Sequence, residues 1–162
     1  MIDFKKLILG TAGYTICTFS LAVGWHVLLF QERYESFGYF EGEPDFLLGL
    51  LTIVLQGVLL STLFPMLKAE GSSFRRGIRF ALVTGAFFWT SHVLAFVAKQ
   101  QVPEVSAFIW METAYLLLQF GLFGLIIGVI HREAIQADGR SNPVDEGEDA
   151  YHQPDGQSHP QC

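Results

Sequence analysis

Charged residues are scarce in this sequence, and the scarcity limits what kind of protein it encodes. Only 16% of the 162 residues are charged, whereas 51% are hydrophobic. The mean hydropathy is +0.36. Soluble domains usually carry about 25% charged residues. The composition therefore excludes an ordinary soluble domain and predicts one compact membrane domain.

Cysteine pairs and clustered basic residues are also missing. Cys17 lies within an apolar segment and Cys162 lies in a polar one, so the two are expected at different depths and cannot form a disulfide. The sequence has no CxxC motif either. Its basic residues form no stripe suited to a phosphate backbone, so we expect no nucleic-acid partner.

What the sequence does have is four long apolar segments. At about 1.5 Å of rise per residue, roughly 20 helical residues cross the hydrocarbon core of a bilayer. We therefore predict an all-α, polytopic membrane protein in which residues 1–135 form a four-transmembrane-helix bundle. The expected spans are approximately residues 7–30, 46–67, 77–98 and 106–130.

The first span has an alternative interpretation as a secretory signal, because Lys5 and Lys6 precede it. Its apolar segment is longer than the core of a signal peptide, however, and no small-x-small cleavage site follows before Gln31. We expect the segment to be retained as a membrane span.

The composition changes after Ala137. Residues 136–162 are mainly Gly, Pro, Gln, Ser, His and acidic residues, so they cannot bury enough apolar surface to offset the entropy cost of ordering. We predict that they form a disordered acidic cytoplasmic tail. A metal site built from His152, His159 and Cys162 is an alternative, although ligands scattered along a flexible chain bind weakly. The acidic residues of this segment are Asp138, Asp145, Glu146, Glu148, Asp149 and Asp155.

The distribution of basic residues predicts the orientation. Four spans place both termini on one side of the membrane, and Arg33 and Lys99 on the other. Because cytoplasmic loops carry the excess of lysine and arginine, we expect a multi-pass inner-membrane protein with both termini in the cytoplasm. The acidic, aromatic loop 31–45 then faces outward, where its rings suit the headgroup layer. The basic residues on the side of the termini are Lys5, Lys6, Lys68, Arg75, Arg76, Arg79, Arg132 and Arg140.

The first and third spans share a short similarity. Residues 26–30, HVLLF, match residues 92–96, HVLAF, at every position but one, and each following span carries a Leu-Gln pair that ends at Gln56 or Gln119. This pattern predicts two duplicated helical hairpins. Chance similarity between apolar helices is the alternative.

Three ionisable residues away from the cytoplasmic boundary form the candidate site: His26, His92 and Glu112. Counting from the ends of the spans puts all three about 6–10 Å below the outer boundary. Charged groups inside spans are costly and usually face the bundle interior or water. Two imidazoles and a carboxylate could ligate a divalent metal, relay protons or, through the histidines alone, hold a haem iron. In the structural alternative, the histidines hydrogen-bond across helices and Glu112 is protonated or reached by water.

Small residues recur at helical spacing in the third and fourth spans. In lipid, such residues let helix backbones approach closely. We predict that they form helix-packing faces, either within one bundle or between copies in a homo-oligomer. The residues concerned are Gly77, Ala81, Gly85, Gly121, Gly124 and Gly128.

The glycines from Gly121 to Gly128, and the Trp25-His26 pair with Tyr34 beyond it, carry a resemblance. The chain resembles small four-helix bacterial inner-membrane proteins of an uncharacterised family. In these proteins a first helix ends near a histidine before an aromatic outer loop, and a glycine-rich third helix follows. The resemblance covers about residues 1–133 and implies a four-helix bundle without implying an activity.

These patterns favour a non-enzymatic membrane component or assembly factor over an enzyme. We expect it to contact the lipid bilayer and other membrane proteins. One alternative is a metal- or haem-binding membrane protein whose site lies near the outer face. Another is a small transporter subunit in which Gln56 and Gln119 line a path at the midplane, although no broken span supports it.

Overall fold

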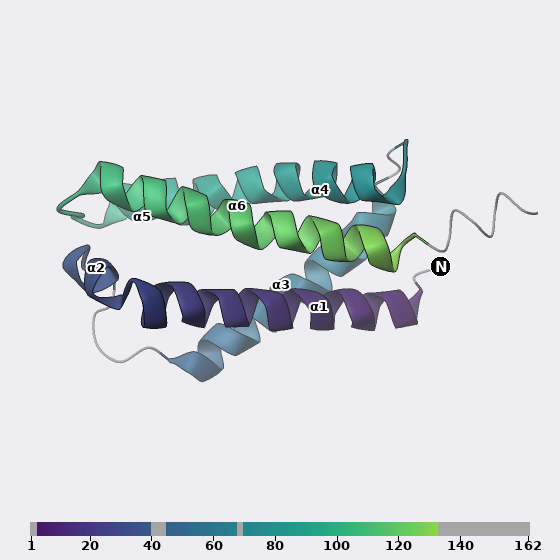
Figure 1. Ribbon diagram of the computed structural model, residues 1–162, viewed down its shortest axis with the longest axis horizontal. Coiled ribbons are helices and arrows are strands. Elements are labelled where there is room, and N and C mark those ends of the chain that lie inside the picture. The colour runs from purple at the N-terminus through teal and green to yellow at the C-terminus, as the bar shows by residue number, and fades with distance from the viewer. Residues whose placement is uncertain (1–2, 40–44, 68–69, 133–162) are drawn as a thin grey trace, which may run out of the picture.

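The described part of the chain is a bundle of four helical rods (Figure 1). The computed structural model describes residues 3–39, 45–67 and 70–132. The first rod joins α1 (Phe4–Ala22) to the π-helical segment η1 (Val23–Leu29), and a short helix α2 (Gln31–Ser36) follows it. The other rods are α3 (Phe46–Met66), the run of α4 (Ser73–Phe88), η2 (Trp89–Leu94) and α5 (Ala95–Lys99), and α6 (Val105–Ile130).

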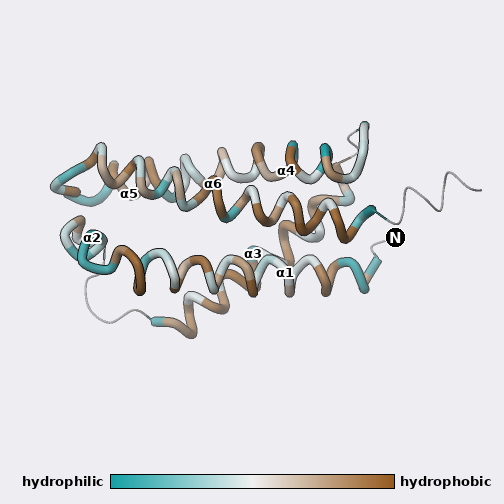
Figure 2. The backbone as a smooth tube through the Cα atoms, in the orientation of Figure 1, coloured by the Kyte–Doolittle hydropathy of each residue, from teal (hydrophilic) through white to brown (hydrophobic). Residues whose placement is uncertain are grey.

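All four rods are long and apolar enough to span a membrane. Apolar residues dominate along each of them, as the brown segments of Figure 2 show. The start of α1 and the end of α6 lie at one end of the bundle, and α2 lies at the other (Figure 1). We call the latter the α2 end. The chain is thus an all-α, polytopic membrane protein of the predicted class.

The span boundaries differ from the predicted ones by a few residues. The third rod begins at Ser73 rather than near residue 77, because the Ser72 side chain caps the helix by accepting a hydrogen bond from the backbone N–H of Arg75. The cap therefore extends the helix by one turn into the basic segment. The predicted tail, 136–162, and its metal alternative at His152, His159 and Cys162 lie outside the described residues.

Small residues allow α4 and α6 to pack closely. A Cβ atom placed on Gly77 would overlap the carbonyl oxygen of Gly124 and come within 3.2 Å of Gly128. A Cβ on Gly124 would lie 2.7 Å from the Cβ of Ala81, and one on Gly85 would lie 3.2 Å from Phe120. These residues therefore face each other within a single bundle.

Gly121 is the exception among the six predicted packing residues. A Cβ atom at this position would meet nothing within 4 Å among the described residues. Although it lies three residues from Gly124 and seven from Gly128, it makes no close contact with the backbone of α4.

The chain at the α2 end folds back over the bundle. Gly38 has a φ of +70°, a left-handed conformation that glycine adopts without strain. The turn there directs Tyr39 toward the bundle, and Tyr34 and Phe37 are 0% and 1% exposed. Tyr34, Phe37 and Tyr39, the described aromatic residues of the loop expected in the headgroup layer, therefore pack inward and cover polar groups that lie beneath them.

Candidate functional site

His26, His92 and Glu112 come together at the α2 end of the bundle. Nε2 of His26 lies 3.0 Å from Oε1 of Glu112, and Nε2 of His92 lies 3.3 Å from Oε2. The Glu112 carboxylate is 0% exposed, whereas the His92 side chain is 41% exposed. The sequence places the three residues at one depth, and in the structure both histidines contact the Glu112 carboxylate. We call this group the His–Glu–His cluster.

Both histidines lie in π-helical segments. His26 is part of η1 and His92 is part of η2. A π-helical turn accommodates an extra residue and occurs frequently at functional sites. The two segments overlap in part with the matching sequences at residues 26–30 and 92–96, and each contains the histidine of its match.

The contacts of His26 require a proton between it and Glu112. Nδ1 of His26 lies 3.1 Å from the backbone oxygen of Ala22, which only accepts hydrogen bonds, so Nδ1 carries hydrogen. In a neutral imidazole, Nε2 would then present a lone pair to the carboxylate. Two acceptors at 3.0 Å repel each other. The pair therefore exists as imidazolium and carboxylate, or as imidazole and carboxylic acid.

Tyrosines cover the cluster from the α2 end. The indole N–H of Trp25 donates to the hydroxyl of Tyr34 at 2.9 Å, and the ring of Tyr34 lies 4.5 Å from that of His26. The hydroxyl of Tyr39 lies 3.3 Å from Nε2 of His92. Burial and then the Glu112 carboxylate raise the pKa of Tyr34 and of Tyr39 above the ordinary value. Both therefore remain neutral phenols at physiological pH.

An exposed ion pair joins α2 to Glu104, the residue that precedes α6. Both guanidinium nitrogens of Arg33 donate to Glu104, at 3.1 and 2.7 Å. The same guanidinium lies 5.1 Å from the ring centroid of Phe37. The bidentate geometry sets the relative orientation of the two side chains, although an exposed ion pair contributes little to the free energy of unfolding. Nothing in the sequence pairs residues 33 and 104, because the contact joins two segments that lie 71 residues apart in the chain.

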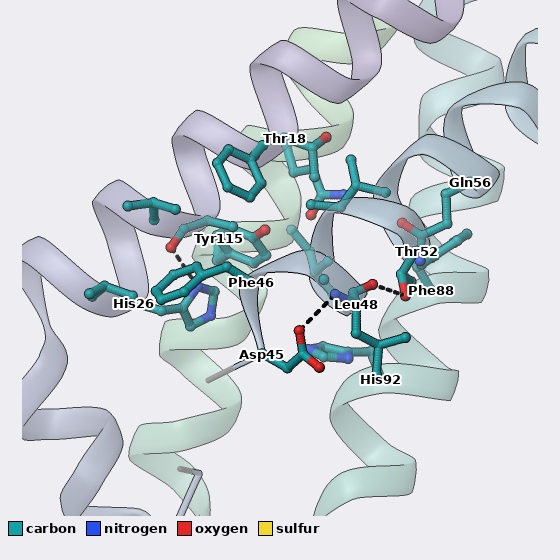
Figure 3. A pocket seen from close by; sticks show the side chains of 18 of the residues that line it. Thr18, His26, Asp45, Phe46, Leu48, Thr52, Gln56, Phe88, His92 and Tyr115 are labelled. Atoms are coloured by element: carbon teal, nitrogen blue, oxygen red, sulfur yellow. Dashed lines mark hydrogen bonds between the residues drawn. The ribbon is translucent and has the colours of Figure 1, made fainter. Parts of the chain in front are cut away.

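A cavity of about 540 Å³ adjoins the cluster (Figure 3). His26 and His92 border it near the α2 end, whereas Gln56 and Gln119 border it deeper in the bundle. The volume falls within the range of roughly 300–1,000 Å³ that is usual for small-molecule sites. Apolar lining residues complete the walls, among them Phe19, Val23, Val27, Phe46, Leu48, Ile53, Phe88 and Leu116.

Tyr14 joins the two glutamines that the sequence singles out. Nε2 of Gln119 donates to the Tyr14 hydroxyl at 2.8 Å, and that hydroxyl donates to Oε1 of Gln56 at 3.0 Å. Tyr14 is 0% exposed. The sequence alone does not reveal this role, because a tyrosine in an apolar span is commonly a packing residue.

Removing the Tyr14 hydroxyl should destabilise the bundle. In Tyr14→Phe, both glutamines lose a partner while the ring keeps its edge contact with Phe123, whose centroid lies 4.9 Å away. We expect the free energy of unfolding in mixed micelles to fall by about 1–3 kcal/mol. Thr62→Val removes a hydroxyl that donates only to Val58 in its own helix, and it should change stability by less than about 0.5 kcal/mol.

The arrangement of the ionisable side chains is relevant to whether the site could bind a metal ion or a haem iron. No group of three His, Cys, Asp or Glu side chains within the described ranges has an arrangement that would hold a metal ion. In the His–Glu–His cluster the ring nitrogens contact carboxylate oxygens instead of surrounding a common point. Because the carboxylate lies between the imidazoles, ligation of a haem iron by His26 and His92 would require Glu112 to move away.

Comparison of the chain with protein-family models, curated proteins and solved structures finds no match.

Proposed function

We propose that this protein is a proton-linked ligand-binding component of the membrane. The His–Glu–His cluster holds an exchangeable proton, and the adjoining cavity receives a small molecule whose binding depends on where that proton resides. This role is a specific form of the non-enzymatic membrane component expected from the sequence.

The contact between His26 and Glu112 carries the proposal. A carboxylate that is 0% exposed is unfavourable in a bilayer-spanning helix unless it is paired or neutralised. A single proton between His26 and Glu112 gives both side chains a hydrogen bond, and either side chain can carry that proton. Imidazole is also the side chain whose unperturbed charge changes within the physiological pH range.

The surroundings of the cluster support a binding role over a purely structural one. His92 is partly exposed and borders the cavity, so the cluster reaches the space that a ligand would occupy. Both histidines lie in π-helical segments, which are rare in proteins and occur frequently at functional sites. A purely structural pair would not need that distortion twice.

We further propose that the protein lies in an inner membrane with both termini in the cytoplasm. The α2 end would then face outward, and the cluster would exchange its proton with the outer compartment. The excess of basic residues on the side of the termini supports this orientation.

The proton can be observed directly. In lipid nanodiscs containing protein with ¹⁵N-labelled histidine, we expect either a protonated Nε2 at His26 or a carboxylic-acid infrared band from Glu112. In Glu112→Gln the side-chain amide donates to a neutral Nε2, so we expect this nitrogen to become unprotonated and the infrared band to be absent.

A matched variant separates this effect from a general change in the protein. Glu104→Gln alters an exposed carboxylate and should leave the His26 signals unchanged. An unprotonated Nε2 together with an ionised Glu112 in the unaltered protein would overturn the proposal. Identical His26 spectra and identical infrared spectra in the unaltered protein and Glu112→Gln would do so as well.

A further inference from the structure

We infer that the cavity binds a lipid-soluble quinone, a flat neutral ring with a carbonyl oxygen at each of two opposite ends. This inference rests on the proposed function, because it names the ligand class of the same site. It concerns binding alone and includes no electron transfer.

Access to the cavity is from the membrane. Phe46, Leu48 and Gly49 of α3 line it and are also exposed on the surface of the bundle. In Figure 1, α3 runs obliquely to the other rods. Because apolar surface on a spanning helix contacts lipid, a ligand dissolved in the bilayer reaches the cavity past these residues.

Hydrogen-bonding groups lie at two separate levels of the cavity. His92 borders it near the α2 end, and Gln56 borders it deeper in the bundle, about two to three helical turns along α3 from Leu48 and Asp45 at the start of that helix (Figure 3). Tyr14 occupies Oε1 of Gln56, which leaves the Gln56 amide N–H groups as donors. Within the described ranges, no hydrogen bond uses these N–H groups or Nδ1 of His92.

The wall between these levels is largely apolar. Ile53 and Phe88 line it, together with the ring of Tyr115. Such a space fits a ring that is apolar across its faces and accepts hydrogen bonds at both ends. A quinone has this pattern, whereas an acyl chain has no oxygen to place at the deeper level.

Charge disfavours anionic ligands. Asp45 lines the cavity and Glu112 lies just behind the histidines, so an anionic headgroup would meet two carboxyl groups. A neutral acceptor of hydrogen bonds avoids this penalty.

Titration with decyl-substituted benzoquinone tests the inference in the same labelled nanodiscs. We expect a saturable change in the ¹⁵N signals of His92, and no such change with decylbenzene, which has the same chain and ring without carbonyl oxygens. His92→Phe should weaken binding at least tenfold, measured by displacement of a labelled quinone.

Two glycines provide a matched pair of blocking variants. A Cβ on Gly49 or on Gly121 would meet nothing within 4 Å among the described residues, so both tolerate a larger side chain. Gly49 lines the cavity, whereas Gly121 lines a separate groove between α4 and α6. Gly49→Phe should reduce quinone affinity at least tenfold, and Gly121→Phe should leave it within about twofold.

The outcomes separate this inference from the proposed function. Absence of a saturable change at His92, equal binding of decylbenzene, or equal effects of Gly49→Phe and Gly121→Phe would each overturn the quinone assignment. The proton shared by His26 and Glu112 would still be detected, on one residue or the other, in those cases if the proposed function holds. Its absence from both residues in unliganded protein refutes the proposed function whether or not the quinone binds.

Discussion

Replacing Glu112 by alanine is expected to lower the free energy of unfolding by about 3–5 kcal/mol, because it removes one member of a buried ionisable pair. His26 would be left with a nitrogen that faces an apolar space, and His92 would lose a contact of 3.3 Å. The loss should appear as a lower midpoint in reversible unfolding from mixed detergent micelles.

The exposed ion pair at the same end of the bundle is the control. Arg33 and Glu104 contact each other at 2.7 Å, but their side chains are 44% and 53% exposed. Water screens such a pair, so Glu104→Ala should cost no more than about 1 kcal/mol. Comparable losses in the two variants would mean that Glu112 is not the buried partner of the histidines.

Replacing Gly77 by valine is expected to separate α4 from α6. A Cβ there overlaps the carbonyl oxygen of Gly124, and backbone atoms cannot move aside as a flexible side chain can. Overpacking in a core commonly costs about 1–3 kcal/mol, and occasionally more. We expect at least the upper part of that range, measured as unfolding free energy in mixed micelles.

Gly121→Val is the matched change on the facing helix. It also introduces a β-branched residue into a spanning helix, but a Cβ there meets no described atom within 4 Å. Stability within about 0.5 kcal/mol of the unaltered protein is therefore expected. Equal destabilisation by the two valines would show that helix propensity, and not the contact between α4 and α6, accounts for the loss.

Two polar residues in the site each contact two partners. Glu112 contacts both histidines, and the hydroxyl of Tyr14 hydrogen-bonds to both glutamines. Each of these residues joins an element of one hairpin to an element of the other, because His26 and Gln56 belong to the first and His92 and Gln119 to the second. The two hairpins are therefore linked by polar contacts as well as by packing.

The sequence by itself determined the number of spans and the common depth of His26, His92 and Glu112. Both follow from one-dimensional rules, since a bilayer fixes the length of an apolar segment and a helix rises by a constant amount per residue. The same rules also identified Gly77, Ala81, Gly85, Gly124 and Gly128 as small residues at helical spacing, which lie at the contact between α4 and α6.

The tertiary structure alone decided which side chains point toward one another. Spans that are apolar on all faces carry little periodic signal, so their sequences do not indicate the inward face. The π-helical turns at His26 and His92 change the direction of the following residues, and an aromatic loop that resembles a headgroup anchor proves to cover the Glu112 carboxylate. The site therefore depends on contacts between residues as far apart as His26 and Glu112, which local sequence cannot encode.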